Sequence, residues 1–198
     1  GNPQRDLASF FNNQKQVLLN SCFSIHGKLV FLKMNPFDVH IILLYNDDSH
    51  IQHGSAQDLL AVQCTVATSR GLHEALLQLG YSTSLLAVRS SLEELVANLQ
   101  EFSTEKTLIF NNCDGFDGSN QAASLVARLL EEKGFIHTGA SAEAVELCIN
   151  KPEAKERLTR ENIPTPCFQV FLNPEEEFHL EFPVIVKPAV EDGSIGIS

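Results

Sequence analysis

The chain is poor in basic residues and has no long hydrophobic run. Its 198 residues include 14 Lys and Arg against 25 Asp and Glu, giving a formal net charge of −11 with neutral histidines. Without a basic surplus it offers no electrostatic footprint for nucleic-acid phosphates or for an anionic membrane surface. No apolar run approaches the ~20 residues that a membrane-spanning helix needs. We therefore expect neither a nucleic acid nor a membrane as partner.

Cysteines are few and scattered, at positions 22, 64, 113, 148 and 167. They form no C-x-x-C pair, and their odd number cannot pair fully within one chain, so a disulfide scaffold is not indicated. A reducing, cytoplasmic location fits this usage. Apolar residues make up 43% of the chain. That content suffices for the core of one large domain or two small ones.

Strand and helix patterns alternate from residue 39 onward. Nearly unbroken apolar residues at 39–45 suit a strand covered on both faces. Further strands are predicted at 84–88, 107–110 and 136–138. Such alternation predicts an α/β, Rossmann-like, doubly wound parallel sheet, whose ligands lie at the carboxyl ends of the strands. Loops 46–55, 111–118 and 139–141 should therefore share the ligand edge.

The intervening helices carry their own boundary signals. Apolar residues at helical spacing predict a long helix over 59–79, with Gly71 as a candidate break and Gly80 as its C-terminal cap. Ser91 and Ser141 are predicted N-caps. The clearest apolar face runs over 122–130, and Gly134 ends that helix.

Three segments divide the chain. Residues 1–36 form a leader, which is either poorly ordered or a hairpin of 21–25 and 28–34 around His26 and Gly27. Residues 37–149 form the Rossmann-like domain. Residues 150–198 begin a second unit, with a helix over 151–161 and strands over 167–172 and 182–187. Because the chain stops where another strand starts, we expect it to be part of a longer protein.

The end of the second unit carries the strongest chemical motif. A predicted strand delivers Lys187, and a turn containing Gly193, Ser194 and Gly196 follows. Free backbone N–H groups, a hydroxyl and an ammonium group form a phosphate-binding arrangement. It is not a P-loop, because no G-x-x-x-x-G-K-[ST] precedes a helix. Taken alone, the motif also fits a hairpin with a glycine-rich turn.

Four ordered segments resemble the ATP-grasp enzymes, and within them the D-alanine–D-alanine ligase-like group. They are FNNCDG (110–115), LLEEKGFIHTG (129–139), NKPEAKERLTRENIPTP (150–166) and FPVIVKPAVEDGSIG (182–196). The resemblance implies a Rossmann-like pre-ATP-grasp domain followed by an incomplete α+β small lobe. It implies that Lys151 and Lys187 hold ATP phosphates beneath a flexible loop containing Gly193, Ser194 and Gly196. Without the resemblance, Lys151 is an ordinary lysine at a helix start.

The resemblance also implies a reaction. ATP phosphorylates a carboxylate of an amino acid or small peptide, and an amine displaces phosphate from the acyl phosphate, with magnesium neutralising charge. The magnesium ligands of this group lie in a C-terminal lobe beyond this chain. We therefore expect the isolated 198 residues to be inactive and the parent protein to be an enzyme. Ligases of this group are often homodimers.

Departures from the pattern put D-alanine specificity in doubt. Asp114 stands where the ligases proper have a histidine, and residues 46–50 offer no clear match to the glutamate that meets the first substrate ammonium. Asp47 and Asp48, with His50 and His53, suit a solvated loop, a metal site or recognition of a substrate amine.

Two further features stay open. Asp114 and Asp117 either contact substrate or cap the helix that begins near Asn120. Cys113 is either a packing residue or a nucleophile, although no histidine is placed in sequence to activate it.

Two functions from different classes are consistent with these observations. The first is the N-terminal portion of an ATP-dependent carboxylate–amine ligase. The second is a truncated, non-catalytic Rossmann-like binding or interaction module. A dinucleotide-binding domain is disfavoured, because no G-x-G-x-x-G follows the first strand.

Overall fold

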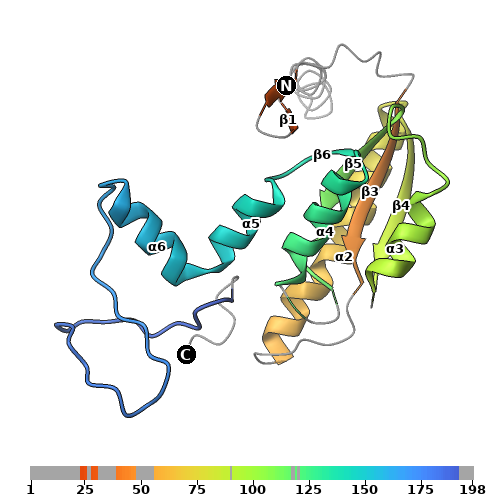
Figure 1. The fold of residues 1–198 in the computed structure, drawn as a ribbon. Helices are drawn as coiled ribbons and strands as arrows, with labels where there is room; N and C mark the ends of the chain where they lie inside the picture. Colours follow the sequence, from red (N-terminus) through yellow and green to blue (C-terminus); the bar gives the residue numbers. More distant parts are fainter. Residues whose placement is uncertain are drawn as a thin grey trace, which may run out of the picture.

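Four parallel strands form the central sheet (Figure 1). The computed structural model describes residues 23–25, 28–30, 39–47, 56–89, 91–116, 119 and 121–191. The strands are β3 (His40–Asn46), β4 (Ser82–Val88), β5 (Thr107–Asn112) and β6 (Ile136–His137), in the spatial order β4-β3-β5-β6. The predicted α/β fold with a parallel sheet is confirmed.

Strand β3 is buried on both faces, as its apolar run predicts. Ile41 and Leu43 pack in one core cluster, while Ile42 and Leu44 pack in another. Successive side chains of a strand point to opposite faces, so this alternation gives the sheet a hydrophobic layer on each side.

Helices cover both layers. Helix α2 (Ala56–Gln78) contributes to the cluster of Ile41, whereas α3 (Leu92–Leu99) and α4 (Ala122–Glu132) contribute to that of Ile42. Helix α2 continues through Gly71, so the candidate break there is wrong. One glycine lowers helix stability by about 1 kcal/mol, which the packing of a 23-residue helix overrides.

The predicted boundary signals are confirmed at several helix ends. Ser91 Oγ accepts from Glu94 N–H, and Ser141 Oγ, at the start of α5 (Ala142–Ile149), accepts from Ala144 N–H. Gly80 has a φ of 84° just beyond α2, a conformation that favours glycine at a helix end.

The leader contains a short hairpin. Strands β1 (Phe23–Ile25) and β2 (Lys28–Val30) pair antiparallel, with Phe23 opposite Val30. This confirms the hairpin interpretation for those residues. His26, Gly27 and the rest of residues 1–36 lie outside the described residues.

The sheet reverses its direction of winding between β3 and β5. The connection from β3 runs through α2 to β4 on one side, and the connection from β5 runs through α4 to β6 on the other. A ligand crevice in an open α/β sheet lies at such a switch point, outside the carboxyl ends of the strands.

Helix α6 (Lys151–Arg160) follows α5 without a linker, and both lead away from the sheet in Figure 1. Asn150 is at once the C-cap of α5 and the N-cap of α6, with φ −83° and ψ 87°. Its Oδ1 accepts from Glu153 N–H at 3.3 Å. The predicted division at residues 149 and 150 stays a prediction.

The strands predicted at 167–172 and 182–187 are wrong, because both segments are irregular. The side chain of Gln169 instead bonds to the backbone on the far side of residues 170–178, where its Oε1 accepts from His179 N–H at 2.9 Å. Leu172 and Val186 are 89% and 82% exposed. Alternating apolar residues make a strand only where a partner strand binds the backbone, and among the described residues neither segment has one.

His40 lies at the amino end of β3, opposite the switch point. Its Nδ1 and Nε2 are 2.8 Å and 2.9 Å from the hydroxyls of Ser82 and Ser84, and its ring stacks on Phe102. Burial, which disfavours the charged imidazolium, holds the pKa of His40 below its ordinary 6.5.

This lowered pKa predicts a pH-dependent free energy of unfolding. The unfolded chain binds the proton more readily than the folded chain, so protonation of His40 favours unfolding. The contribution of neutral His40 to the free energy of unfolding is therefore complete above about pH 6.5 and is lost as pH falls through the folded pKa. Urea unfolding at about pH 5.5 and about pH 7 should show a smaller loss on acidification in His40→Gln than in the wild type. Equal losses in the two proteins would contradict the prediction.

None of the described helices is long and apolar enough to cross a membrane.

Candidate functional site

Asparagine side chains at the carboxyl ends of β3 and β5 bind neighbouring segments, and Asn46 is buried while Asn112 is half-buried. Asn46 Oδ1 accepts from Asp114 N–H at 3.2 Å, linking the residues that follow the two strands. Asn112 Nδ2 donates to Ser69 Oγ on α2 at 2.8 Å. The side-chain amides of Asn46 and Asn112 therefore make the switch point polar. Sequence reasoning did not single out these asparagines, although Asn46 directly follows the strand predicted at 39–45 and Asn112 lies two residues after the one predicted at 107–110.

Asp47 is paired with an arginine that sequence reasoning missed. Arg89 Nη2 and Nε lie 3.1 Å and 3.2 Å from Asp47 Oδ2. The two residues directly follow β3 and β4, and the ends of neighbouring parallel strands meet, which is the signal that could have found the pair. The pair is exposed to solvent, at 57% and 38%, and a cation at Asp47 would have to share this carboxylate with Arg89.

Other residues predicted around this edge fall into two groups. Asp114 is exposed at the switch point, where a substrate could reach it. Asp48, His50, His53 and Asp117 lie outside the described residues. Among the residues that are described, no group of three or more His, Cys, Asp or Glu side chains is placed to hold a metal ion.

Cys113 belongs to the core. It is 5% exposed, packs in the cluster of Ile42 and Leu44, and its Sγ donates to Gly115 O at 3.0 Å. A buried thiol in apolar surroundings is unreactive, which favours the packing interpretation over the nucleophile.

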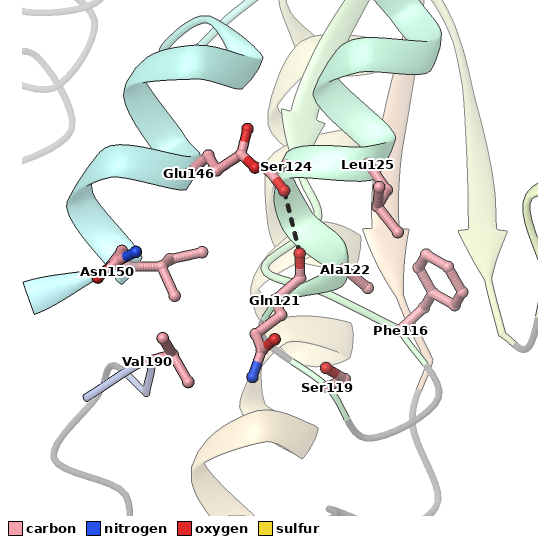
Figure 2. A pocket seen from close by; sticks show the side chains of 10 residues that line it. Phe116, Ser119, Gln121, Ala122, Ser124, Leu125, Glu146, Asn150 and Val190 are labelled. Carbon is pink, nitrogen blue, oxygen red and sulfur yellow. Dashed lines mark hydrogen bonds between the residues drawn. The ribbon is translucent and has the colours of Figure 1, made fainter. Parts of the chain in front are cut away.

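A pocket of about 550 Å³ lies beside this edge (Figure 2). Figure 2 shows Phe116 and Ser119 from the loop after β5, the first turn of α4, and Val190 facing them from the second unit. Ser124 Oγ donates to Gln121 O at 3.1 Å. Apart from Glu146, whose carboxylate is 2.7 Å from Arg128, the described lining carries no charge.

A larger groove of about 920 Å³ lies between α6 and the irregular segments that follow it. Lys151 and Lys155 of α6 and Lys187 line it together. Three lysines against one acidic residue, Glu181, give this lining a basic surplus in a chain of net charge −11. The structure thus brings Lys151 and Lys187 to the same groove, while Gly193, Ser194 and Gly196 lie outside the described residues.

The two predicted lysines differ in their partners. Lys151 donates from its backbone N–H to Ala189 O at 2.9 Å and from Nζ to Glu191 O. Within the described part of the chain, Lys187 Nζ makes no hydrogen bond or ion pair. The groove therefore holds one ammonium group tied to backbone and one open to a ligand. An ammonium group that lines an open groove suits the oxygens of a phosphate.

Comparisons with known proteins point to one class. No protein-family model matches the chain. It is 30% identical over 157 residues to the D-alanine–D-alanine ligase of Francisella philomiragia, covering 78% of this chain and 47% of that protein. It is 26% identical over 140 residues to the D-alanine–D-alanine ligase of Geotalea uraniireducens, covering 69% and 43%.

A solved structure shares the fold. The D-alanine–D-alanine ligase of Bacillus anthracis, crystallised with ATP, matches with a TM-score of 0.58 and 18% identity, covering 80% of this chain and 50% of that one. The chain spans about half the length of the curated relatives that it matches.

Fold and sequence together relate the chain to the ATP-grasp enzymes. Within that class it is D-alanine–D-alanine ligase-like, and the relationship extends over the N-terminal portion of those ligases.

Proposed function

We propose that the chain is the N-terminal portion of an ATP-dependent ligase that joins the carboxylate of an amino acid or small peptide to an amine. The observation that carries this proposal is the groove shared by Lys151 and Lys187, in a chain similar to half of a D-alanine–D-alanine ligase. A groove of about 920 Å³ is large enough for a nucleotide.

Lys151 and Lys187 bind the phosphates of ATP in this proposal, and Gly193, Ser194 and Gly196 form the loop that folds over them. ATP supplies the phosphoryl group that activates the carboxylate as an acyl phosphate. The ammonium groups lower the cost of the negative charge that develops during transfer. Lys151 directs one of its three N–H donors to the Glu191 carbonyl and keeps two for phosphate, whereas Lys187, among the described residues, has all three.

The substrate side of the proposal lies at the switch point. Asp114 is the candidate there, because it is exposed beside the carboxyl ends of β3 and β5. In this proposal the magnesium ligands lie in a C-terminal half of the complete protein, which would correspond to the second half of the D-alanine–D-alanine ligases. A cytoplasmic homodimer is the assembly that we propose for the complete protein.

The decisive experiment compares this chain with the protein that its complete reading frame encodes. We expect the complete protein to release phosphate from ATP when amino acids are supplied, and the 198-residue chain to release none. Phosphate release by the 198 residues alone would contradict the need for a second half. A stop codon directly after Ser198 would instead favour the non-catalytic binding module.

A further inference from the structure

Lys155 joins α6 to the segment that forms the opposite wall of the groove. Its Nζ donates to Thr165 Oγ1 at 3.0 Å and to Pro166 O at 2.9 Å, and lies 5.3 Å from the ring centroid of Phe168. All four residues line the groove. One ammonium group therefore makes two hydrogen bonds and a cation–π contact with residues ten or more positions away in sequence.

From these contacts we infer that Lys155 is a positioning residue, which holds residues 165–168 against α6 and so sets the width of the nucleotide groove. The inference rests on the proposed function, because the groove matters for activity only if a nucleotide occupies it. Lys155 differs in role from Lys151 and Lys187, since its donors are already directed to the wall of the groove.

The surroundings of residues 165–168 show why such a contact is needed. The segment has no regular secondary structure, and neither Pro164 nor Pro166 can donate a backbone hydrogen bond. At the end of α6, Ile163 N–H donates to Leu158 O at 2.9 Å. Beyond that bond, the side chain of Lys155 ties the irregular chain to the helix at Thr165 and Pro166.

The contact itself is tested without any nucleotide, by acetylating the 198-residue chain and quantifying each lysine by mass spectrometry. Lys133, exposed at the end of α4, is the internal reference. Two hydrogen bonds should slow acetylation of Lys155 about fivefold or more relative to Lys133. Thr165→Val should remove part of that protection. Equal reactivity of Lys155 and Lys133 in the wild type would overturn the inference.

The consequence for the groove is tested by titrating ATP with Mg²⁺ into the protein encoded by the complete reading frame. Lys155→Met should weaken binding about tenfold, and Thr165→Val, which keeps the charge, about threefold in the same direction. Lys155→Arg should restore most of the affinity. Arg157→Met removes an equal charge from α6 outside the groove and should leave the affinity unchanged.

The outcomes separate the positioning role from the proposed function. Thermal unfolding of the sheet domain should be unchanged in Lys155→Met, because the lost contacts lie outside that domain, so weaker binding is not a loss of the fold. Affinity unchanged in both Lys155→Met and Thr165→Val would overturn the positioning role. A protected Lys155 in a protein that binds no ATP would overturn the proposed function and leave the contact between Lys155 and residues 165–168 established.

Discussion

Replacing Lys187 with alanine in the complete protein should raise the KM for ATP about 10- to 100-fold and lower kcat, because a hydrogen bond to a charged group contributes about 1.5–3 kcal/mol. The KM for the amino-acid substrate should change little. Lys151→Ala should have a smaller effect on the KM, since one of the three N–H donors of Lys151 is directed to the Glu191 carbonyl. Steady-state kinetics with each substrate varied in turn measures both effects.

Two controls separate phosphate binding from a general loss of positive charge. Lys133→Ala removes one exposed ammonium group outside the groove and should leave all kinetic constants unchanged. Competition by adenosine, which has no phosphate, should be equally strong in the wild type and in Lys187→Ala. An unchanged KM for ATP in Lys187→Ala would show that this lysine does not bind the phosphates.

Replacing Leu130 with alanine should lower the free energy of unfolding by about 3–5 kcal/mol, the largest stability effect expected for a single substitution in the sheet domain. Leu130 is fully buried on α4, where it belongs to the cluster of Ile42 and Leu44. Truncation removes apolar contacts and leaves a cavity between the helix and the sheet, which the close-packed strands cannot fill.

Leu125 provides the matched control on the same helix, because its side chain is 47% exposed. Leu125→Ala should cost less than about 1 kcal/mol, since little apolar surface is lost and no closed cavity forms. Equilibrium urea unfolding, followed by far-UV circular dichroism, measures the two variants against the wild type. Equal losses would mean that α4 does not face the sheet through Leu130.

The sheet domain could be predicted from sequence because its signals are local and repeated. The run at 39–45 and the apolar face at 122–130 each indicate which surfaces are buried, and caps such as Ser91 mark where helices begin. Periodicity failed at 167–172, because strand formation depends on a partner elsewhere in space.

The candidate site was predictable only in part. Lys151 and Lys187 were identified through the resemblance of their segments to one family, and they line one groove. The pairing of Asp47 with Arg89, and the contacts of Lys155 with Thr165, join residues that are 42 and 10 positions apart. The first pair could have been found only from the order of the strands, because both residues directly follow neighbouring strands; the second depends on how the irregular segment folds back on α6, which local spacing does not encode.

The shared cap at Asn150 gives the junction of α5 and α6 no spare length. Each residue added to a helix rotates the rest of that helix by about 100°, since an α-helix has about 3.6 residues per turn. An insertion in the last turn of α5 would therefore rotate α6, and the groove that it lines, about the axis of α5, while the contacts of Lys151 and Lys155 with residues later in the chain move with them. The direction in which the groove faces, relative to the sheet, thus depends on the number of residues at the junction of α5 and α6.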